Sequence, residues 1–207
     1  MPVLYSYIVA YDSGFAPNPF NGFCTLATCK PDIRKNVTIN DWIVGTGSNR
    51  RGVERGGFLV YAMRVQEILT FSDYWKDSRF TRKKPNLSGS YRMACGDNIY
   101  CPNPDSNGWI QLNSYHSWND GTPRQKHINR DTSIDRVLVS NEFVYFGAEG
   151  PEITNELNAE LVHKGRGYRK FNDQSLIAEF ESWLCNLKLK GYQGMPFDML
   201  QEAQKRK

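Results

Sequence analysis

Apolar residues in the first third of the chain gather in short runs bounded by turn residues, a pattern typical of β-strands. Residues 3–11 form one run, and residues 42–46 and 58–65 form two more. The segment between the last two runs, residues 49–57, is rich in glycine and arginine. We predict that these two runs pair as a long hairpin, and that residues 67–70 continue its second strand.

A helical period appears in two places. Near the C-terminal end, apolar residues at steps of one and three predict an amphipathic helix, with Asn172 or Asp173 as its cap: Leu176, Ile177, Phe180, Trp183, Leu184 and Leu187. A shorter helix is predicted from residue 70 to residue 76, with Thr70 or Ser72 as its cap. Strands followed by helices predict an α+β fold.

Irregular segments separate these elements. Residues 12–22 contain two prolines, two glycines and two asparagines, so we expect a loop. Its Phe15 either anchors the loop in the core or stacks on a base, with Asn18 hydrogen-bonding the edge of that base. Residues 113–133 are also predicted to be irregular. The spacing of His116 and His127 in that segment fits no metal motif, and we expect both at the surface.

Composition limits the class of protein. The chain has 207 residues, 40% of them hydrophobic and 13% aromatic, which is typical of a globular protein. Neither a long apolar run nor a signal-like start is present, so we expect a cytoplasmic protein without a membrane span. The five cysteines lack the spacing of a zinc knuckle, so we expect reduced thiols and no metal or cofactor.

Positive charge is concentrated in one part of the chain. The net charge of the whole chain is +4, but residues 30–92 contain 13 Lys/Arg and only 6 Asp/Glu. This asymmetry indicates an anionic partner, although soluble domains also show such unevenness by chance. The predicted phosphate contacts are Arg50, Arg51, Arg55, Arg82, Lys83 and Lys84. The alternative is that these residues belong to solvated loops.

Two polar turns are candidate ligand contacts. Thr46-Gly47-Ser48 ends the first hairpin strand with small residues that allow close approach of a polar ligand. Asp97 and Asn98 follow Gly96 and offer acceptors and donors from a single turn. Each turn can equally have a purely local role. No phosphate-binding Gly-Lys-Ser/Thr loop, deaminase pattern or nucleophile elbow is present.

Six segments together resemble a known family: residues 11–20 (YDSGFAPNPF), 24–31 (CTLATCKP), 41–48 (DWIVGTGS), 59–65 (LVYAMRV), 71–75 (FSDYW) and 96–100 (GDNIY). The chain resembles the nucleotide modification associated domain of the second type, from about residue 3 to about residue 170. The resemblance implies a role in phage or bacterial systems that make or handle modified nucleotides in DNA. It implies no catalytic residue.

A looser resemblance concerns the fold. The order of strands and helix around residues 41–76 is similar to the PUA-like group, including its EVE and ASCH types. That resemblance implies a small twisted β-barrel with flanking helices, in which a flipped base is held in a pocket. From the length and the family resemblance we expect a single nucleotide modification associated domain over residues 1–207. That domain would have a β-rich core at 1–171, an insertion at about 101–135 and a helical segment at 172–207.

Three hypotheses for the function follow. The first is a module that recognises a modified base or nucleotide in nucleic acid, with DNA as the expected partner. Its predicted pocket is lined by Phe15, Asn18, Thr46, Gly47, Ser48, Asp97, Asn98 and Tyr100. The second is an enzyme acting on a nucleotide or base through Asp12, Asp97 or a cysteine such as Cys24. The third is a structural subunit with protein partners from a modification or defence system.

Overall fold

The protein is described from a computed structural model, which covers residues 1–153, 155–162 and 165–205. Two compact units share the chain, and each consists of segments that are separate in sequence. The first unit contains Met1–Ser13, Val37–Gln66 and Ser140–Lys207. The second unit contains Gly14–Asn36 and Glu67–Val139. The chain therefore alternates between the two units.

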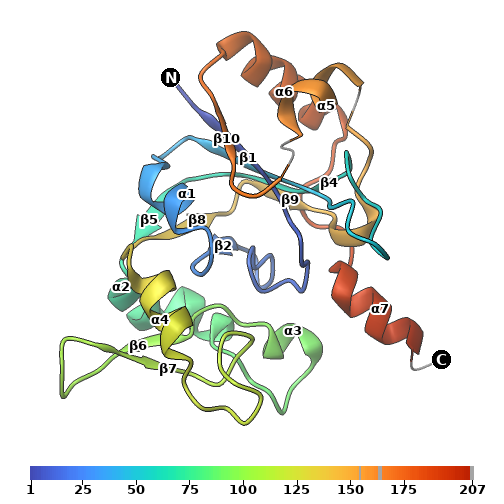
Figure 1. Ribbon diagram of the computed structural model, residues 1–207. Helices are drawn as coiled ribbons and strands as arrows, with labels where there is room; N and C mark the ends of the chain where they lie inside the picture. The colour runs from blue at the N-terminus through green and yellow to red at the C-terminus, as the bar shows by residue number, and fades with distance from the viewer. Residues whose placement is uncertain (154, 163–164, 206–207) are drawn as a thin grey trace. The chain divides into compact units, whose positions relative to one another are not determined.

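A six-stranded mixed sheet forms the first unit (Figure 1). Its strands, in spatial order, are β10 (Arg169–Phe171), β1 (Leu4–Ile8), β3 (Trp42–Thr46), β4 (Leu59–Arg64), β9 (Phe143–Tyr145) and β11 (Gly191–Tyr192). The pairs β1–β3 and β9–β11 are parallel, and the other neighbours are antiparallel. The predicted hairpin is confirmed, because β3 and β4 pair from Trp42↔Arg64 to Thr46↔Leu59.

Helices cover one face of this sheet. Side chains alternate along a strand, so Trp42 and Val44 point to the same face, where they join one apolar cluster. The same cluster includes residues of α5 (Asn155–Leu161) and α6 (Gln174–Asn186). The predicted C-terminal helix and its cap are confirmed, because Asp173 Oδ1 accepts from the backbone N–H of Ser175 at 2.8 Å. The first unit also contains η2 (Gly147–Glu149) and α7 (Phe197–Lys205).

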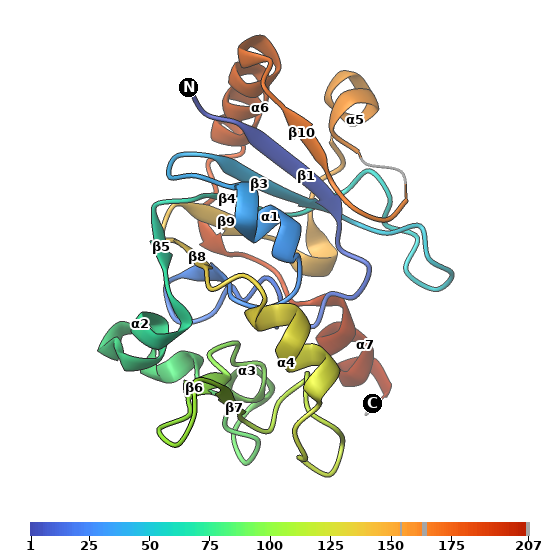
Figure 2. The same cartoon turned by 60° about the vertical axis from the view of Figure 1, so that its left-hand side comes forward.

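The second unit has two small sheets, formed by β2 (Cys24–Leu26), β8 (Val137–Ser140) and β5 (Glu67–Leu69) and by β6 (Tyr100–Pro102) and β7 (Trp109–Gln111). Its helices are α1 (Pro31–Asn36), α2 (Phe71–Lys76), η1 (Ser78–Lys83), α3 (Tyr91–Ala94) and α4 (Gln125–Thr132) (Figure 2). The predicted cap of α2 is confirmed: Thr70 Oγ1 accepts from the backbone N–H of Asp73 at 3.0 Å. Buried aromatic residues of these elements form a separate core.

Two details of the sequence prediction are wrong. Residues 67–69 do not continue β4, because they turn into β5 and pair with β8. Residues 113–133, predicted to be irregular, contain α4.

The fold is α+β, as predicted, but the expected PUA-like barrel is not found. Within the described residues, the six-stranded sheet ends at the edge strands β10 and β11, and neither smaller sheet closes. The PUA-like resemblance is therefore not confirmed. No helix in the described ranges combines the length and the apolar character needed to cross a membrane.

Candidate active site

Three segments of the second unit bring a thiol, an imidazole and a carboxylate together. Cys29 lies in the turn between β2 and α1, His116 follows β7, and Asp131 belongs to α4. Cys29 and Lys30 have φ angles of 59° and 41°, in the left-handed region that few non-glycine residues adopt. Such conformations cluster at functional sites, where the surrounding structure holds them in place.

A buried arginine holds the backbone of this turn. Arg34 of α1 is fully buried, and its Nε donates to the carbonyl oxygen of Cys29 at 3.0 Å. The same guanidinium donates to the carbonyl oxygen of Asp131 at 2.5 Å. Burial lowers the pKa of Arg34 to about 10, so it remains charged at neutral pH. Arg34 therefore fixes Cys29 relative to α4.

The three functional groups form one hydrogen-bonded line. Cys29 Sγ lies 3.5 Å from His116 Nε2, and His116 Nδ1 lies 2.6 Å from Asp131 Oδ2. Tyr100 Oη donates to the same carboxylate oxygen at 2.8 Å. The backbone N–H of Cys29 donates to Asp131 Oδ1 at 3.1 Å. Because a carboxylate only accepts, Asp131 fixes the proton of His116 on Nδ1 and directs Nε2 to the sulfur.

The protonation states of His116 and Asp131 follow from their burial and from the charges beside them. Burial disfavours the charged imidazole, but hydrogen bonds with Asp131 and Cys29 outweigh it and raise the pKa of His116 to about 9. Burial would also raise the pKa of the Asp131 carboxyl. The hydrogen bond from His116 and the charges of His116 and Arg130 instead hold that pKa well below its usual range. At neutral pH the pair is therefore an imidazolium and a carboxylate.

A second cation lies beside the sulfur. Arg130 Nη2 is 3.9 Å from Cys29 Sγ and 3.4 Å from His116 Nδ1, and its Nε donates to Asp131 at 2.9 Å. Its side chain is 42% exposed, so it extends from the buried carboxylate to the surface. Cationic neighbours stabilise a thiolate and any negative charge that develops near it. Arg130 is thus placed to serve both roles.

The same three side chains have to be considered as a metal site. The ligand atoms of Cys29, His116 and Asp131 all lie within 4.8 Å of one another, and this donor set suits zinc. However, both Asp131 oxygens already accept hydrogen bonds, and the charge of Arg130 opposes a second cation. The chain fits proton transfer between side chains better than metal coordination.

This arrangement can perform nucleophilic catalysis. A thiol, a base within hydrogen-bond reach and a third group that orients the base are the parts of a catalytic triad. His116 can hold a proton on Nε2 beside the sulfur and later donate it to a leaving group. Cys29 is half-buried, so the residue is partly open to solvent.

The eight residues predicted to line a pocket are all buried. Thr46, Gly47 and Ser48 belong to the first unit, and Phe15, Asn18, Asp97, Asn98 and Tyr100 belong to the second. Tyr100 contacts the candidate site through Asp131, and Phe15 packs against His116 with ring centroids 4.7 Å apart. Phe15 is thus an anchor of the core, one of the two roles predicted for it.

Lys83, predicted to contact phosphate at the surface, is instead buried, and this prediction is corrected. Its exposure is 1%, and its ammonium donates to Asn18 Oδ1 at 2.6 Å, the Phe23 carbonyl at 2.7 Å and Thr25 Oγ1 at 3.1 Å. Burial lowers the pKa of Lys83 to about 8. The donors of this ammonium are used inside the protein.

Asp97 lies on the other side of the same network. Thr25 Oγ1 and Tyr74 Oη each donate to its carboxylate at 2.7 Å. Burial raises the pKa of Asp97, and the charge of Lys83 counteracts part of that rise. Lys83 and Asp97 are therefore a structural charge pair linked through Thr25, rather than groups that meet a ligand at the surface.

The other predicted phosphate contacts are accessible. Arg50, Arg51 and Arg82 are exposed, and Arg55 and Lys84 are half-buried. The Arg50 guanidinium lies 4.3 Å from the ring of Tyr11, which is 67% exposed.

The acids and the thiol considered for catalysis lie in the interior. Asp12 accepts from Tyr145 Oη and from the backbone N–H of Phe197 at the start of α7. Burial raises the pKa of the Cys24 thiol to about 12, so it is protonated at neutral pH. Neither group is placed to react with a substrate.

Sequence reasoning missed the candidate site. It placed His116 at the surface, whereas His116 is 8% exposed and lies 87 positions from the cysteine that it contacts. No local spacing connects Cys29, His116 and Asp131. The enzyme hypothesis named Cys24 as an example of a reactive cysteine, whereas the cysteine beside His116 is Cys29 of the same segment, Cys24–Pro31.

Together the fold and the site define an α+β protein with a cysteine–histidine–aspartate centre. The chain belongs to the family described as nucleotide modification associated domain 2, whose model matches residues 1–203. This confirms the family resemblance noted in the sequence. Comparisons with curated proteins and with solved structures found no match. The family description associates the chain with nucleotide modification, and thus with a nucleic acid or modified nucleotide as its partner.

Proposed function

We propose that the chain is an enzyme of nucleotide modification that uses Cys29 as a covalent nucleophile. The observation that carries this proposal is the line from Cys29 Sγ through the His116 ring to Asp131, with contacts of 3.5 Å and 2.6 Å. Three side chains that are distant in sequence converge there, and their order matches the roles of nucleophile, base and orienting acid.

Each charged or reactive side chain of the site has a separate role in the proposed reaction. In the reactive form the proton of Cys29 is already held on His116 Nε2 as an imidazolium, and the sulfur attacks an electrophilic carbon of a base or of a group attached to a nucleotide. An S–C bond forms, and an electron pair moves onto the substrate beside Arg130, whose charge stabilises it. His116 then returns the proton to the departing group or to the ring. Asp131 keeps His116 in the tautomer that this transfer needs.

The test is peptide-resolved alkylation followed by a search for turnover. At neutral pH, iodoacetamide is expected to react faster with Cys29 than with the half-buried Cys101, which is the internal reference. Nucleotides that are substrates should protect Cys29, add mass to the intact protein as a covalent adduct, and be converted by the wild type but not by Cys29→Ser. If Cys29 reacts no faster than Cys101 and no nucleotide protects it, the enzyme proposal fails.

A second candidate function is the recognition of a modified base in nucleic acid, in a phage or bacterial DNA-modification or defence system. The stacking of Arg50 on the exposed ring of Tyr11 favours it, because such pairs contact phosphates and bases together. This is also the role of the PUA-like domains, although no barrel closes in the described part of the chain. The eight predicted pocket residues are buried, so a base would reach them only after local opening.

Oligonucleotides with and without modified bases, titrated at two salt concentrations, test this second function. Recognition predicts binding that depends on the modification and weakens with salt. Exchanging Arg50 and Arg51 for glutamine should reduce the salt dependence, whereas Lys35→Gln, an exposed control, should not. Absence of both binding and turnover would leave the role of a structural subunit.

A further inference from the structure

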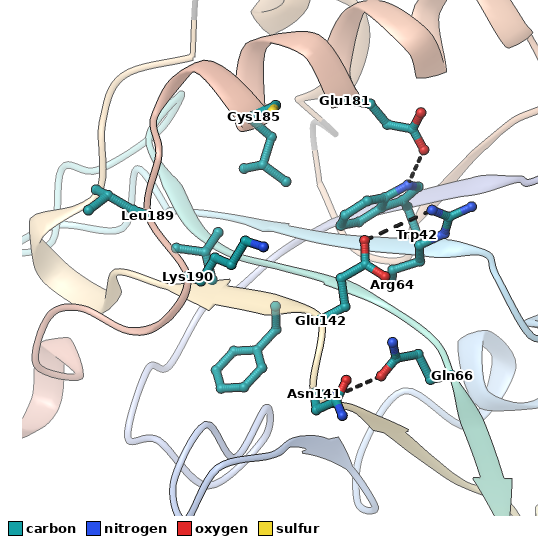
Figure 3. A pocket seen from close by; sticks show the side chains of 12 residues that line it. Trp42, Arg64, Gln66, Asn141, Glu142, Glu181, Cys185, Leu189 and Lys190 are labelled. Carbon is teal, nitrogen blue, oxygen red and sulfur yellow. Dashed lines mark hydrogen bonds and ion pairs between the residues drawn. The ribbon is translucent and has the colours of Figure 1, made fainter.

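A pocket in the first unit is not used by either proposed function. It has a volume of about 550 Å³, which is in the range of small-molecule sites. Strands β3, β4 and β9 provide one side of the pocket, and α6 with the segment after it provides the other (Figure 3). All of its lining residues belong to the first unit, so the pocket lies within one compact body.

The inner wall of the pocket is apolar and partly aromatic. Trp42, Phe143 and Val144 come from the sheet, and Leu184 comes from α6. Trp42 is held in place, because its Nε1 donates to Glu181 Oε1 at 2.7 Å and its ring packs edge-on against a core phenylalanine. A wall of this kind favours a flat, apolar ligand body over a flexible polar chain.

The charges around the pocket balance. Arg64 and Lys190 are positive, and Glu142 and Glu181 are negative. Arg64 Nη1 lies 3.9 Å from Glu142 Oε1, and Glu181 is already bonded to Trp42. No excess of positive charge remains for a triphosphate. The pocket therefore matches a neutral ligand.

Two amides supply directional hydrogen bonding. Gln66 and Asn141 are both exposed at the pocket, and Gln66 Oε1 accepts from the backbone N–H of Asn141 at 3.0 Å. That contact holds the two residues side by side. An amide side chain offers both a donor and an acceptor, so the pair can hydrogen-bond a ring edge that has an acceptor and a donor of its own.

We propose that this pocket binds a neutral heteroaromatic compound, a nucleoside or free base, at a site separate from Cys29. The face of the ligand ring would pack against the aromatic wall, and the amides of Gln66 and Asn141 would hydrogen-bond the edge of the ring. The balanced charge selects the nucleoside over its triphosphate. This binding site is independent of the proposed reaction of Cys29, because the residues that line the pocket do not include Cys29, His116 or Asp131.

Cys185 provides the test, because this exposed thiol of α6 lines the pocket. Adenosine, guanosine, cytidine and thymidine are each compared with their 5′-triphosphates by equilibrium dialysis and by the rate of Cys185 alkylation. At ten times its Kd, a bound nucleoside should slow alkylation about tenfold. The triphosphate should protect less.

Matched variants locate the binding. Gln66→Ala should weaken nucleoside binding about tenfold, as expected for one hydrogen bond. Glu179→Ala, on an exposed part of α6 outside the pocket, should leave it unchanged. Cys29→Ser should also leave it unchanged, which separates this site from the proposed enzyme activity.

Three results would overturn the proposal. The first is that no nucleoside binds or protects Cys185. The second is that triphosphates protect as well as nucleosides, which would contradict selection by balanced charge. The third is that Cys29→Ser abolishes binding, which would place the ligand at the candidate active site instead.

Discussion

Replacing Asp131 by asparagine should disable the candidate active site while preserving the shape of the side chain. In the structure, Asp131 Oδ1 accepts from the Cys29 backbone at 3.1 Å and from Arg130 Nε at 2.9 Å. Oδ2 accepts from His116 Nδ1 at 2.6 Å and from Tyr100 Oη at 2.8 Å. Asparagine has only one acceptor oxygen, so donors that now meet Oδ2 would face an NH₂ group.

The magnitude follows from these contacts. Hydrogen bonds to charged groups contribute about 1.5–3 kcal/mol each, so losing those that His116 and Tyr100 make to Oδ2 should destabilise the fold by about 3–5 kcal/mol. Without the carboxylate, burial disfavours the imidazolium of His116, and so does the like charge of Arg130, whose Nη2 lies 3.4 Å from His116 Nδ1. Its pKa should fall from about 9 to below its ordinary value of about 6.5. The preferred tautomer would then carry its proton on Nε2 and could not accept from Cys29; the equivalent change in a serine protease triad costs about 10⁴ in kcat.

Two measurements follow this change. The first is an NMR titration of the imidazole Cε1–H signals, which is simple because the chain has only three histidines. The second is the alkylation rate of Cys29 at neutral pH, relative to Cys101. A loss of about 1.4 kcal/mol in thiolate stabilisation corresponds to a tenfold slower reaction. Asp120→Asn, at an exposed aspartate, is the control.

The reasoning would be refuted by a folded Asp131→Asn protein in which His116 still titrates near pH 9. It would equally be refuted if Cys29 kept its wild-type alkylation rate, because the reactivity of the sulfur would then not depend on the orientation of the imidazole.

Three further predictions concern stability. The folded pKa of His116, about 9, lies above its ordinary value, so its stabilisation is complete below about pH 6.5 and is lost as the pH rises through 9. The free energy of unfolding should fall by up to about 3 kcal/mol over that interval in urea denaturation, and a flat profile would contradict this. Lys83→Met should cost about 3–5 kcal/mol, because it leaves Asp97 buried without its compensating charge. Adding Asp97→Asn should recover part of that cost, and strictly additive effects in the double-mutant cycle would argue against the pairing. Asp173→Ala should cost about 1 kcal/mol in thermal unfolding by removing the cap of α6, whereas Asp173→Asn should cost less.

Local pattern predicted the elements that local forces determine. The period of α6, the cap of α2 and the β3–β4 pairing all depend on neighbours within a few residues or on one short connection. The path of the chain after β4 depends on a different kind of information. Residues 67–69 follow β4 almost directly, yet they pair with β8, about 70 positions later. Hydrophobic pattern alone does not distinguish between those two partners.

The candidate active site could not be predicted from the sequence for a related reason. His116 shares no periodic pattern with Cys29 or Asp131, and its burial follows from contacts such as Phe15, which lies about 100 positions away. Lys83 was misplaced because its basic neighbours suggested a surface loop. Its ammonium is held by oxygens from residues 18–25, which no property of the local sequence reveals.

The alternation of the two units along the chain sets an order for their completion during synthesis. The second unit ends at Val139, whereas the first unit also needs the residues from Ser140 onward. Until then β1 lacks its neighbour β10 and β4 lacks its neighbour β9, so both are open sheet edges. At 5–20 residues per second, a ribosome needs about 2–6 s to add residues 140–171, which include both missing strands. During that interval the nascent first unit is a template for pairing with other chains, and a chaperone that covers β1 and β4 would have its greatest effect then.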